Sequence, residues 1–579
     1  MRTDKCTYVG MKQGIFKNKQ IERKKRMKKM KKLVSLLLTV VMVMAMTVTV
    51  FAAPSKVKIT VPNNEGHVYD IFQIFTGDIS TSDAGQKVLS NVKWGKNGAQ
   101  KEGNDVSDEI LAALGKITSS TSNADNTTID SILSTLGIQK SSLTNDSAFK
   151  KDIVAGQSEE VPSGYYLVKD KDNSQANKDD AYTLLLISVV GPTTLTAKMD
   201  TTNVVKKVDD VNDSTGVSET LKDSADYDIG DAVPFTLTAT LAENISAYKK
   251  YHITFVDTLE SGKFSAISDL TIKLNGNDIT NGDGYSVSTT GYTGDAGPTV
   301  NGFTKTIEFT ATDGYLPESL NKATVSIEFT ATLGENATIG LPGNENKVKL
   351  EYSNNPNDDQ GGEEGSTPED KVKVFTYKVD VNKVTGTAPN LTDLKGADFT
   401  LYKKVAGTTI TSEDGETATS YPQDAKTGAV IKAAFDASVK ADALEDETYY
   451  VVVGHKTGSA AGSTFEFKGV DDGEYVLVET TIPEGYNAWD ATAFKISAKH
   501  SEGEEPTLTE LTGGNLFSGN VGSVDTNGGK LETNVVNNQG TTLPETGGIG
   551  TTIFYVLGAI LVLGAGIVLV TRRRMSVEK

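Results

Sequence analysis

Two lysines lie at positions where an alternating segment would turn their side chains toward an apolar interior. Lys206 stands in the middle of the segment 204–208, and Lys383 shares the parity of Val379 and Val381. Burial of an ammonium group is costly, so the pKa of such a lysine falls and its neutral amine becomes available as a nucleophile. Periodicity alone leaves open the commoner arrangement, in which each lysine lies on a solvent-facing side of its strand.

The segments around these lysines carry the pattern of antiparallel β-sheet. Apolar and polar residues alternate over 233–241 and 323–333, and clusters of Gly, Asn and Asp separate such segments. That pattern predicts β-sandwich domains over most of the chain. Helical spacing is limited to the first third, where 107–114 and 128–136 each begin with a capping residue followed by apolar positions three and four apart. We expect two short helices inserted in a β domain.

Three motifs follow Lys383 along the sequence. They are Leu394-Lys-Gly-Ala-Asp-Phe-Thr-Leu-Tyr402, Gly473-Glu-Tyr-Val-Leu-Val-Glu-Thr-Thr-Ile-Pro-Glu-Gly-Tyr486 and Val535-Val-Asn537. With these motifs, the region 377–540 resembles the collagen-adhesin B-type (CnaB-like, SpaA-type) domains of sortase-assembled pilins. The resemblance implies a mainly β fold of tandem Ig-like (CnaA/CnaB-type) sandwiches.

The resemblance also implies an autocatalytic cross-link. In such domains a lysine of the first strand and an asparagine of the last form an intramolecular isopeptide bond. A buried, protonated glutamate between them polarises the amide and relays protons. Carried over to this chain, Lys383 is the nucleophile, Asn537 the acceptor and Glu479 the catalyst. Asn538 is the neighbouring alternative, but Asn537 shares the strand face of Val535.

The preceding region, 201–376, resembles another isopeptide-forming unit, the D2 domain of major fimbrial subunits. The matching stretches are Val205-Lys-Lys-Val-Asp-Asp-Val-Asn-Asp213, Tyr227-Asp-Ile-Gly-Asp231, Phe255-Val-Asp-Thr-Leu259 and Gly343-Asn-Glu-Asn-Lys-Val-Lys-Leu-Glu-Tyr-Ser-Asn-Asn-Pro356. The resemblance implies a bond between Lys206 and Asn346, assisted by Asp257. Asn344 has the parity of Asn346, and Glu328 could replace Asp257, so both alternatives stay open.

The first domain differs at the catalytic position. Pro162-Ser-Gly-Tyr-Tyr-Leu-Val-Lys-Asp170 parallels Asp472-Gly-Glu-Tyr-Val-Leu-Val-Glu-Thr480, so Lys169 stands where Glu479 does. We therefore predict no isopeptide bond in the first domain, which would make it the most labile part of the chain before assembly.

Lys198 is the candidate for joining one subunit to the next. It lies in Leu195-Thr-Ala-Lys-Met-Asp200, where pilin subunits of this kind carry a Tyr-Pro-Lys or Thr-Pro-Lys element. In those proteins the lysine attacks the acyl-enzyme of another subunit. This chain lacks the proline, but Lys198 precedes Lys206 by eight residues, which fits the element's place. Lys206 itself and Lys207 are the rivals, and an ordinary exposed lysine is the remaining alternative.

The C-terminus carries a second reactive element. A pentapeptide precedes an apolar run, 553–570, and the basic residues 572–574, in the order typical of a cell-wall sorting signal. The run is long enough to span a membrane, and the basic residues predict a cytoplasmic end. In proteins with this signal a sortase cysteine attacks the Thr-Gly carbonyl, and an amine resolves the thioester. The pentapeptide, with Thr546 as the implied acyl donor, is Leu543, Pro544, Glu545, Thr546 and Gly547.

The N-terminal sequence predicts a signal peptide. A basic stretch at 24–32 precedes the apolar run 33–51 and two alanines, so cleavage is expected near Ala52. An uncleaved membrane anchor is the alternative. The first 26 residues are unusual for a signal peptide, and a translation start at Met27 or Met30 would explain them.

Composition narrows the classes of function. The chain has a net charge of −19; residues 1–32 contribute +11 and residues 572–579 contribute +3, so the remainder carries −33. Such an acidic surface argues against nucleic acid and anionic lipid as partners. Cys6, the only cysteine, lies in the removed segment, so no disulfide can form in the exported part. No metal-ligand spacing, phosphate loop or hydrolase nucleophile motif is found, and no cofactor is expected.

The sequence suggests five segments. The turn-rich stretch 353–370 could be an interdomain linker, and a long hairpin explains it at least as well. The segments are the extension with signal peptide (1–53), a CnaB-like N-terminal pilin domain (54–200), the D2 domain (201–376), the CnaB-like domain (377–540) and the sorting signal with a transmembrane segment (541–579).

These expectations together predict a secreted structural protein and not an enzyme. We expect a subunit of a covalent pilus on a Gram-positive cell surface, whose precursor is held in the membrane. The expected partners are sortase, identical subunits and peptidoglycan, with minor pilins and host surface ligands as further candidates. The alternative is a minor pilin or anchored adhesin, in which binding to a host or partner surface is primary.

Overall fold

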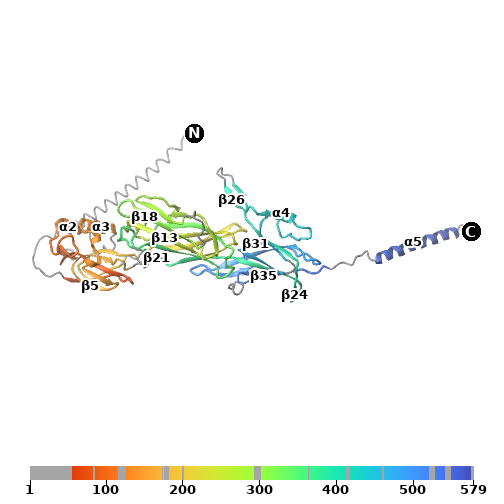
Figure 1. Cartoon of the computed structure of the whole chain (residues 1–579), viewed down its shortest axis with the longest axis horizontal. Helices are drawn as coiled ribbons and strands as arrows, with labels where there is room; N and C mark the ends of the chain where they lie inside the picture. Colours follow the sequence, from red (N-terminus) through yellow and green to blue (C-terminus); the bar gives the residue numbers. More distant parts are fainter. Residues whose placement is uncertain are drawn as a thin grey trace, which may run out of the picture.

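The computed structural model describes residues 55–575 with internal gaps. Those gaps are residue 65, 83–84, 115–125, 173, 175–180, 198–200, 293–300, 363, 412–416, 459–461, 521–527 and 541–548. The described chain is an elongated row of β-sheet units followed by a separate C-terminal helix (Figure 1). The strands fall into three consecutive regions, which we call region I (56–194), region II (203–375) and region III (377–536).

Region I contains two sheets, with strand orders β5-β1-β8 and β3-β2-β6-β7, and β4 pairs with β2. The two helices predicted for the first third are present, and their apolar residues pack onto the second sheet. The elements are β1 (Lys56–Thr60), β2 (Val68–Thr81), β3 (Lys87–Trp94), α2 (Asp108–Leu114), α3 (Asn126–Thr135), the 3-10 turns η2 (Lys140–Ser142) and η3 (Asn145–Ser147), β4 (Lys150–Val154), β5 (Ser158–Pro162), β6 (Gly164–Asp170), β7 (Leu184–Val189) and β8 (Thr193–Thr194).

Region II consists of two seven-stranded sheets that share one apolar core. Their orders are β10-β9-β12-β19-β15-β16, with β14 on β19, and β11-β22-β20-β13-β18-β17, with β21 on β20. The elements are β9 (Asn203–Asn212), β10 (Val217–Lys222), β11 (Ser224–Asp226), β12 (Ala232–Thr240), η4 (Ile245–Ala247), β13 (Lys250–Leu259), β14 (Phe264–Ile267), β15 (Thr271–Leu274), β16 (Asn277–Asp278), β17 (Tyr285–Gly291), β18 (Phe303–Ala311), η5 (Glu318–Leu320), β19 (Thr324–Leu333), β20 (Asn344–Ser353), β21 (Glu364–Ser366) and β22 (Asp370–Phe375).

The alternation in region II decides which side chains enter this core. In β12, Val233, Phe235 and Leu237 are buried, and the polar residues between them point the other way. The stretch 353–370 forms a hairpin inside region II, because β21 and β22 both pair with β20. The hairpin alternative is therefore the arrangement that the structure adopts.

Region III contains a five-stranded sheet, a six-stranded sheet and a small two-stranded one. The five-stranded sheet has the order β24-β23-β35-β34, with β30 on β23, and the six-stranded sheet has the order β28-β29-β25-β31-β32-β33. The elements are β23 (Tyr377–Thr387), β24 (Asn390–Asp393), β25 (Asp398–Lys404), β26 (Thr408–Thr411), β27 (Thr417–Ser420), β28 (Lys426–Thr427), α4 (Gly428–Ala433), β29 (Tyr449–Thr457), β30 (Thr464–Val470), β31 (Gly473–Thr481), β32 (Thr492–His500), β33 (Leu508–Thr512), β34 (Ser518–Asn520) and β35 (Lys530–Val536).

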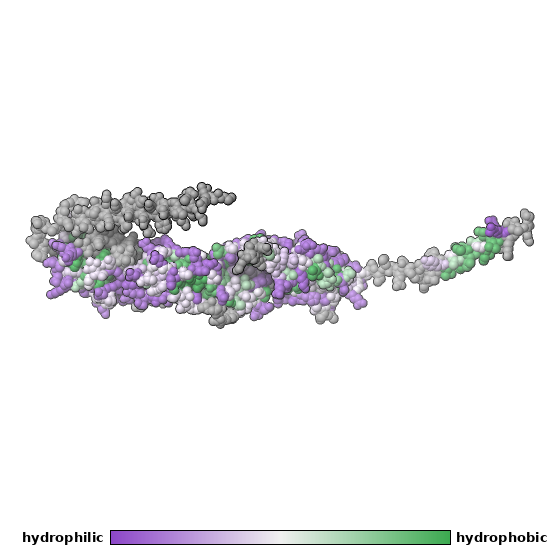
Figure 2. Space-filling model, turned by 90° about the horizontal axis from the view of Figure 1, so that it is seen from above, coloured by the Kyte–Doolittle hydropathy of each residue, from purple (hydrophilic) through white to green (hydrophobic). Residues whose placement is uncertain are grey.

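The C-terminal helix α5 (Ile549–Met575) extends away from region III. Its apolar side chains between 555 and 570 are exposed and form the most continuous hydrophobic surface in Figure 2. Of the helices in the described part of the chain, none is both long and apolar enough to cross a membrane.

Candidate functional site

The first candidate centre lies in the core of region II. Lys206 on β9 comes from one sheet, and Asp257 on β13 and Asn346 on β20 come from the other. The Lys206 ammonium contacts the Asp257 carboxyl, and both side chains are fully buried. Asn346 pairs with Leu259, so it lies on the same face as Asp257, one diagonal step along the ladder. The structure thus brings Lys206 and Asp257 into contact and buries Asn346 in the same core, one diagonal step from Asp257.

Burial sets the protonation of this centre. It lowers the pKa of Lys206 and raises the pKa of Asp257, because neither charge is solvated there. The rings of Phe235 and Phe329 shield the lysine, with centroids 5.3 and 5.5 Å from Nζ. Both shifts move the pair from an ion pair toward a neutral amine beside a protonated carboxyl. This is the state in which the amine can attack and the acid can donate a proton.

The sequence could not decide between Asn344 and Asn346, but the two side chains differ in their hydrogen bonds. The Asn344 side chain accepts from the Thr338 amide at 2.7 Å and donates to the carbonyls of Thr338 and Val374 at 3.1 and 3.0 Å. Within the described residues, Nδ2 and Oδ1 of buried Asn346 have no hydrogen-bond partner. The Asn344 amide is therefore occupied by backbone groups of Thr338 and Val374, whereas the buried amide of Asn346 is not.

Glu328, the alternative to Asp257, lies away from Lys206. Glu328 lies on the outer side of β19, where its carboxylate accepts from Lys273 at 2.7 Å and is 42% exposed. From the far side of the sheet, this carboxylate cannot contact Lys206. Asp257, and not Glu328, is therefore the carboxyl that contacts Lys206.

The second centre lies in the core of region III. Lys383 Nζ is 2.9 Å from Glu479 Oε1, and both side chains are fully buried. Asn537 donates through Nδ2 to Glu479 Oε1 and Oε2 at 2.8 and 2.9 Å. Lys383 and Asn537 belong to neighbouring parallel strands, because Val535 pairs with Lys383, and they face Glu479 on the opposite sheet. Asn538 is exposed, so the nearby alternative does not enter the centre.

Two contacts that stabilise this second centre were not predicted from the sequence. The backbone amide of Trp489 donates to Glu479 Oε2 at 2.9 Å, and the Phe399 ring centroid lies 5.6 Å from Lys383 Nζ. Burial lowers the pKa of Lys383, as it does for Lys206. Neither support has a local sequence signal, because Trp489 acts through its backbone and Phe399 depends on the pairing of β25 with β31.

The remaining predicted site residues fall in two groups. In region I, Lys169 on β6 contacts Asp172 at 3.0 Å and stands directly opposite Asp70. Lys198 lies outside the described residues, as do the signal peptide and the sorting signal from Leu543 to Gly547. The rivals of Lys198 are described: Lys206 is buried in its centre, and Lys207 contacts Asp223.

Comparisons with known families match two parts of the chain. Residues 535–576 match the LPXTG cell wall anchor motif, and residues 377–510 match the prealbumin-like fold domain (SpaA). The chain thus carries a segment similar to the LPXTG cell wall anchor motif and, before it, one similar to the prealbumin-like fold domain.

Two curated proteins are similar in sequence. The trypsin-resistant surface T6 protein of Streptococcus pyogenes serotype M6 is 29% identical over 259 residues, 41% of this chain and 46% of that protein. Fimbrial subunit type 1 of Actinomyces viscosus is 28% identical over 192 residues, 32% of this chain and 30% of that protein. The chain spans less than half the length of both relatives. The predicted resemblance to anchored pilins is confirmed by these matches and by the anchor motif.

Solved structures give a weaker likeness. The T6 backbone pilin of serotype M6 S. pyogenes superposes with a TM-score of 0.44 at 16% identity, covering 85% of this chain and 100% of that one. The full-length major pilin SpaD of Corynebacterium diphtheriae gives 0.36 at 14% identity, covering 85% and 99%.

Proposed function

We propose that this chain is the backbone subunit of a sortase-polymerised pilus, stabilised by two autocatalytic Lys–Asn isopeptide bonds. The observation that carries the proposal is the pair of buried lysine–acid–asparagine centres, one in each of two successive regions. A buried charged pair is weak evidence for stability by itself, so a chemical use is the better explanation of two such centres. The alternative is a minor pilin or adhesin with the same anchor, in which ligand binding is primary.

The same reaction is proposed at both centres. The lysine amine attacks the side-chain carbonyl carbon of asparagine and forms a C–N bond, while the carboxyl donates a proton to the amide oxygen. The carboxylate then takes a proton from the lysine nitrogen and passes it to the asparagine nitrogen. The C–N bond of the side-chain amide breaks and ammonia leaves, while the proton on the former amide oxygen returns to the carboxylate, so the new amide carbonyl forms and the acid is regenerated. The bonds are Lys206–Asn346 and Lys383–Asn537, with Asp257 and Glu479 as proton carriers.

The bonds would change how force crosses each region. In region III the bond joins β23 to the end of β35, the first and last strands. In region II it joins the first strand, β9, to β20, and the chain continues through β21 and β22, which are held on β20. A pulling force would therefore follow covalent bonds past most of each core. A fibre without disulfides has a clear use for that arrangement.

The domain division and assembly complete the proposal. Residues 54–200, 201–376 and 377–540 would be three Ig-like (CnaA/CnaB-type) domains, supported by the changes of sheet near residues 200 and 376. The sorting signal would supply Thr546 as acyl donor, and Lys198 of another subunit would resolve it. The last subunit would pass to peptidoglycan. The apolar run of α5, which lies inside the matched anchor motif, would hold the precursor in the membrane. Minor pilins and host surfaces are the further partners.

Intact mass of the recombinant ectodomain tests the two bonds. Each bond releases one ammonia, so two bonds predict a mass about 34 Da below that calculated from the sequence. A deficit of about 17 Da would leave one bond, and an unshifted mass would exclude both. Region I is expected to contribute no loss of mass, since Lys169 occupies the position of the catalytic glutamate.

The two asparagines of region II allow a matched comparison. The Asn346→Ala ectodomain is expected to lose about 17 Da less than the parent protein, because the acceptor is gone. The Asn344→Ala ectodomain should keep the full deficit and lose about 1–3 kcal/mol of stability, because turn hydrogen bonds are left unpaired. Tandem mass spectrometry of the cross-linked peptides locates the bond. A peptide joining Lys206 to residue 344 would refute the assignment.

A further inference from the structure

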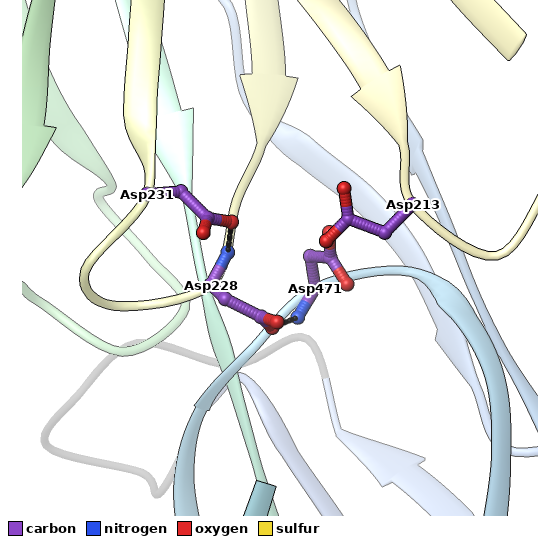
Figure 3. Close-up of side chains that lie close together, drawn as sticks. All are labelled: Asp213, Asp228, Asp231 and Asp471. Atoms are coloured by element: carbon purple, nitrogen blue, oxygen red, sulfur yellow. Dashed lines mark hydrogen bonds between the residues drawn. The ribbon is translucent and has the colours of Figure 1, made fainter. Parts of the chain in front are cut away.

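A third buried lysine lies where regions II and III meet. Lys403 on β25 of region III is fully buried, and its Nζ lies 2.8 Å from Asp213 Oδ2, 2.9 Å from Asp228 Oδ2 and 2.6 Å from Asp471 Oδ1. Asp213 and Asp228 belong to turns of region II, whereas Asp471 belongs to region III (Figure 3). One ammonium group therefore binds carboxylates from both regions.

Backbone hydrogen bonds hold the same turns together. The Asp471 amide donates to Asp228 Oδ1 at 2.9 Å, and the Ala406 amide donates to the Asp213 carbonyl at 2.7 Å. The Ile229 amide donates to the Gly469 carbonyl at 3.1 Å. These bonds fix the aspartates relative to Lys403, so the contact is a built junction and not a chance meeting of surface side chains.

The junction holds more negative than positive charge. Asp213, Asp228, Asp231 and Asp471 each place a carboxylate oxygen within 4.8 Å of the others, around one lysine. Carboxylates this close in a partly dry site cannot all ionise, so some retain protons. Burial, with help from Asp228 and Asp213, raises the pKa of Asp231 to about 7. Burial and Asp228 also raise the pKa of Asp471 well above its usual value.

Lys403 behaves differently from the lysines of the two cross-linking centres. Burial alone would lower its pKa, but Asp471, Asp228 and Asp213 raise the pKa well above its usual value. A permanently charged ammonium is no nucleophile, so Lys403 is not a third cross-linking residue. Its Nζ also occupies the point between the carboxylates where a metal ion would have to bind. The cluster thus carries its own cation.

We propose that Lys403 and the four aspartates form a proton-dependent latch, which joins regions II and III into one rigid body at acid to neutral pH and loosens in alkaline medium. The proposal is independent of pilus assembly and of the two isopeptide bonds. Other titratable groups facing this junction from the packed elements are Asp209, Asp210, Glu219, Lys222, Asp226, Tyr227, Tyr377, Asp472, Tyr475, Lys495 and His500.

The direction of the pH dependence follows from the raised pKa values. A carboxyl whose pKa is higher in the closed junction than in the separated regions stabilises closure below its ordinary pKa. That contribution is lost as the pH rises through the raised value. The value is about 7 for Asp210, which burial and Asp472 of region III raise, and about 7 for Asp231, which lies beside Asp471 of region III. Lys403 has a raised pKa too, so its contribution is fully present throughout this window. The junction is therefore tighter near pH 6 than near pH 9.

Distance measurements on the ectodomain test the latch. The exported chain has no cysteine, so Ser288→Cys in region II and Ser438→Cys in region III, both exposed, accept two spin labels. Double electron–electron resonance is expected to give a narrow distance distribution near pH 6 and a broader one near pH 9. The Lys403→Met variant should be broad at both pH values, and excess CaCl2 should change neither protein.

Two control variants isolate the cause. Lys404→Met removes the neighbouring lysine, which binds Glu474 within region III, and should match the parent. The double variant Asp210→Asn, Asp231→Asn removes both carboxyls that titrate near pH 7, keeps an acceptor for the Asp228 amide and should stay narrow at both pH values. A parent distribution that does not change with pH, a narrow Lys403→Met distribution or a double Asp210→Asn, Asp231→Asn variant that still opens would overturn the latch. So would an extra loss of about 18 Da from Lys403–Asp condensation.

Discussion

The Glu479→Gln ectodomain is expected to retain the ammonia that the parent loses in region III, a mass about 17 Da above the cross-linked form after correction for the substitution. Glutamine can still accept from Asn537 and from the Trp489 amide, so the fold is retained. It cannot carry a proton between the reacting amine and the leaving nitrogen. Of all substitutions, this one separates the chemistry most cleanly from the packing.

Loss of the bond should also lower the stability of region III by a large amount. The cross-link closes a loop from residue 383 to residue 537, 154 residues. If the loop-closure entropy of disulfides applies, the bond stabilises region III by about 5 kcal/mol. For a unit of this size, that corresponds to a fall in Tm of about 10–20 °C. Calorimetry of the Glu479→Gln ectodomain should show one unfolding transition, that of region III, at a lower temperature.

Glu474→Gln is the matched control for this prediction. Glu474 lies on the same strand as Glu479 but binds Lys404 on the exposed side. It should keep the mass deficit and the parent transition. A Glu479→Gln protein that still loses ammonia would assign the proton transfers to another group.

Substitution of Lys198 is expected to have the largest effect on assembly. In cells, the parent protein should give a ladder of SDS-resistant polymers, and Lys198→Ala should leave only anchored monomer. The structure sharpens this expectation, because Lys206 is enclosed in the core and cannot reach an acyl-enzyme. Lys207 is partly exposed but contacts Asp223.

Lys207→Ala is therefore the control and should polymerise as the parent does. Thr546→Ala should abolish both polymer and wall attachment, since it breaks the pentapeptide that the sortase recognises. A ladder that survives Lys198→Ala would transfer the joining role to another lysine. Absence of any ladder from the parent would favour the anchored adhesin.

Much of the mainly β fold follows from period-2 alternation, which is a local property. The same alternation turned Lys206 and Lys383 inward, and both are fully buried. It also marked Lys403, which shares the parity of Phe399 and Leu401, and this signal was missed. Parity alone could not distinguish the roles of these three lysines. It predicts on which side of a strand a residue lies, but not which side chains it meets there.

What the sequence by itself determined is therefore the set of inward lysines, the strands that carry them and the sorting signal. The tertiary structure decided the partners. Asp257 and Glu479 reach their lysines from the opposing sheet, and register places Asn346, not Asn344, free beside the acid. Whether a buried lysine is a nucleophile or a fixed cation depends on how many carboxylates surround it. That number is set by contacts between distant segments, which no local pattern specifies.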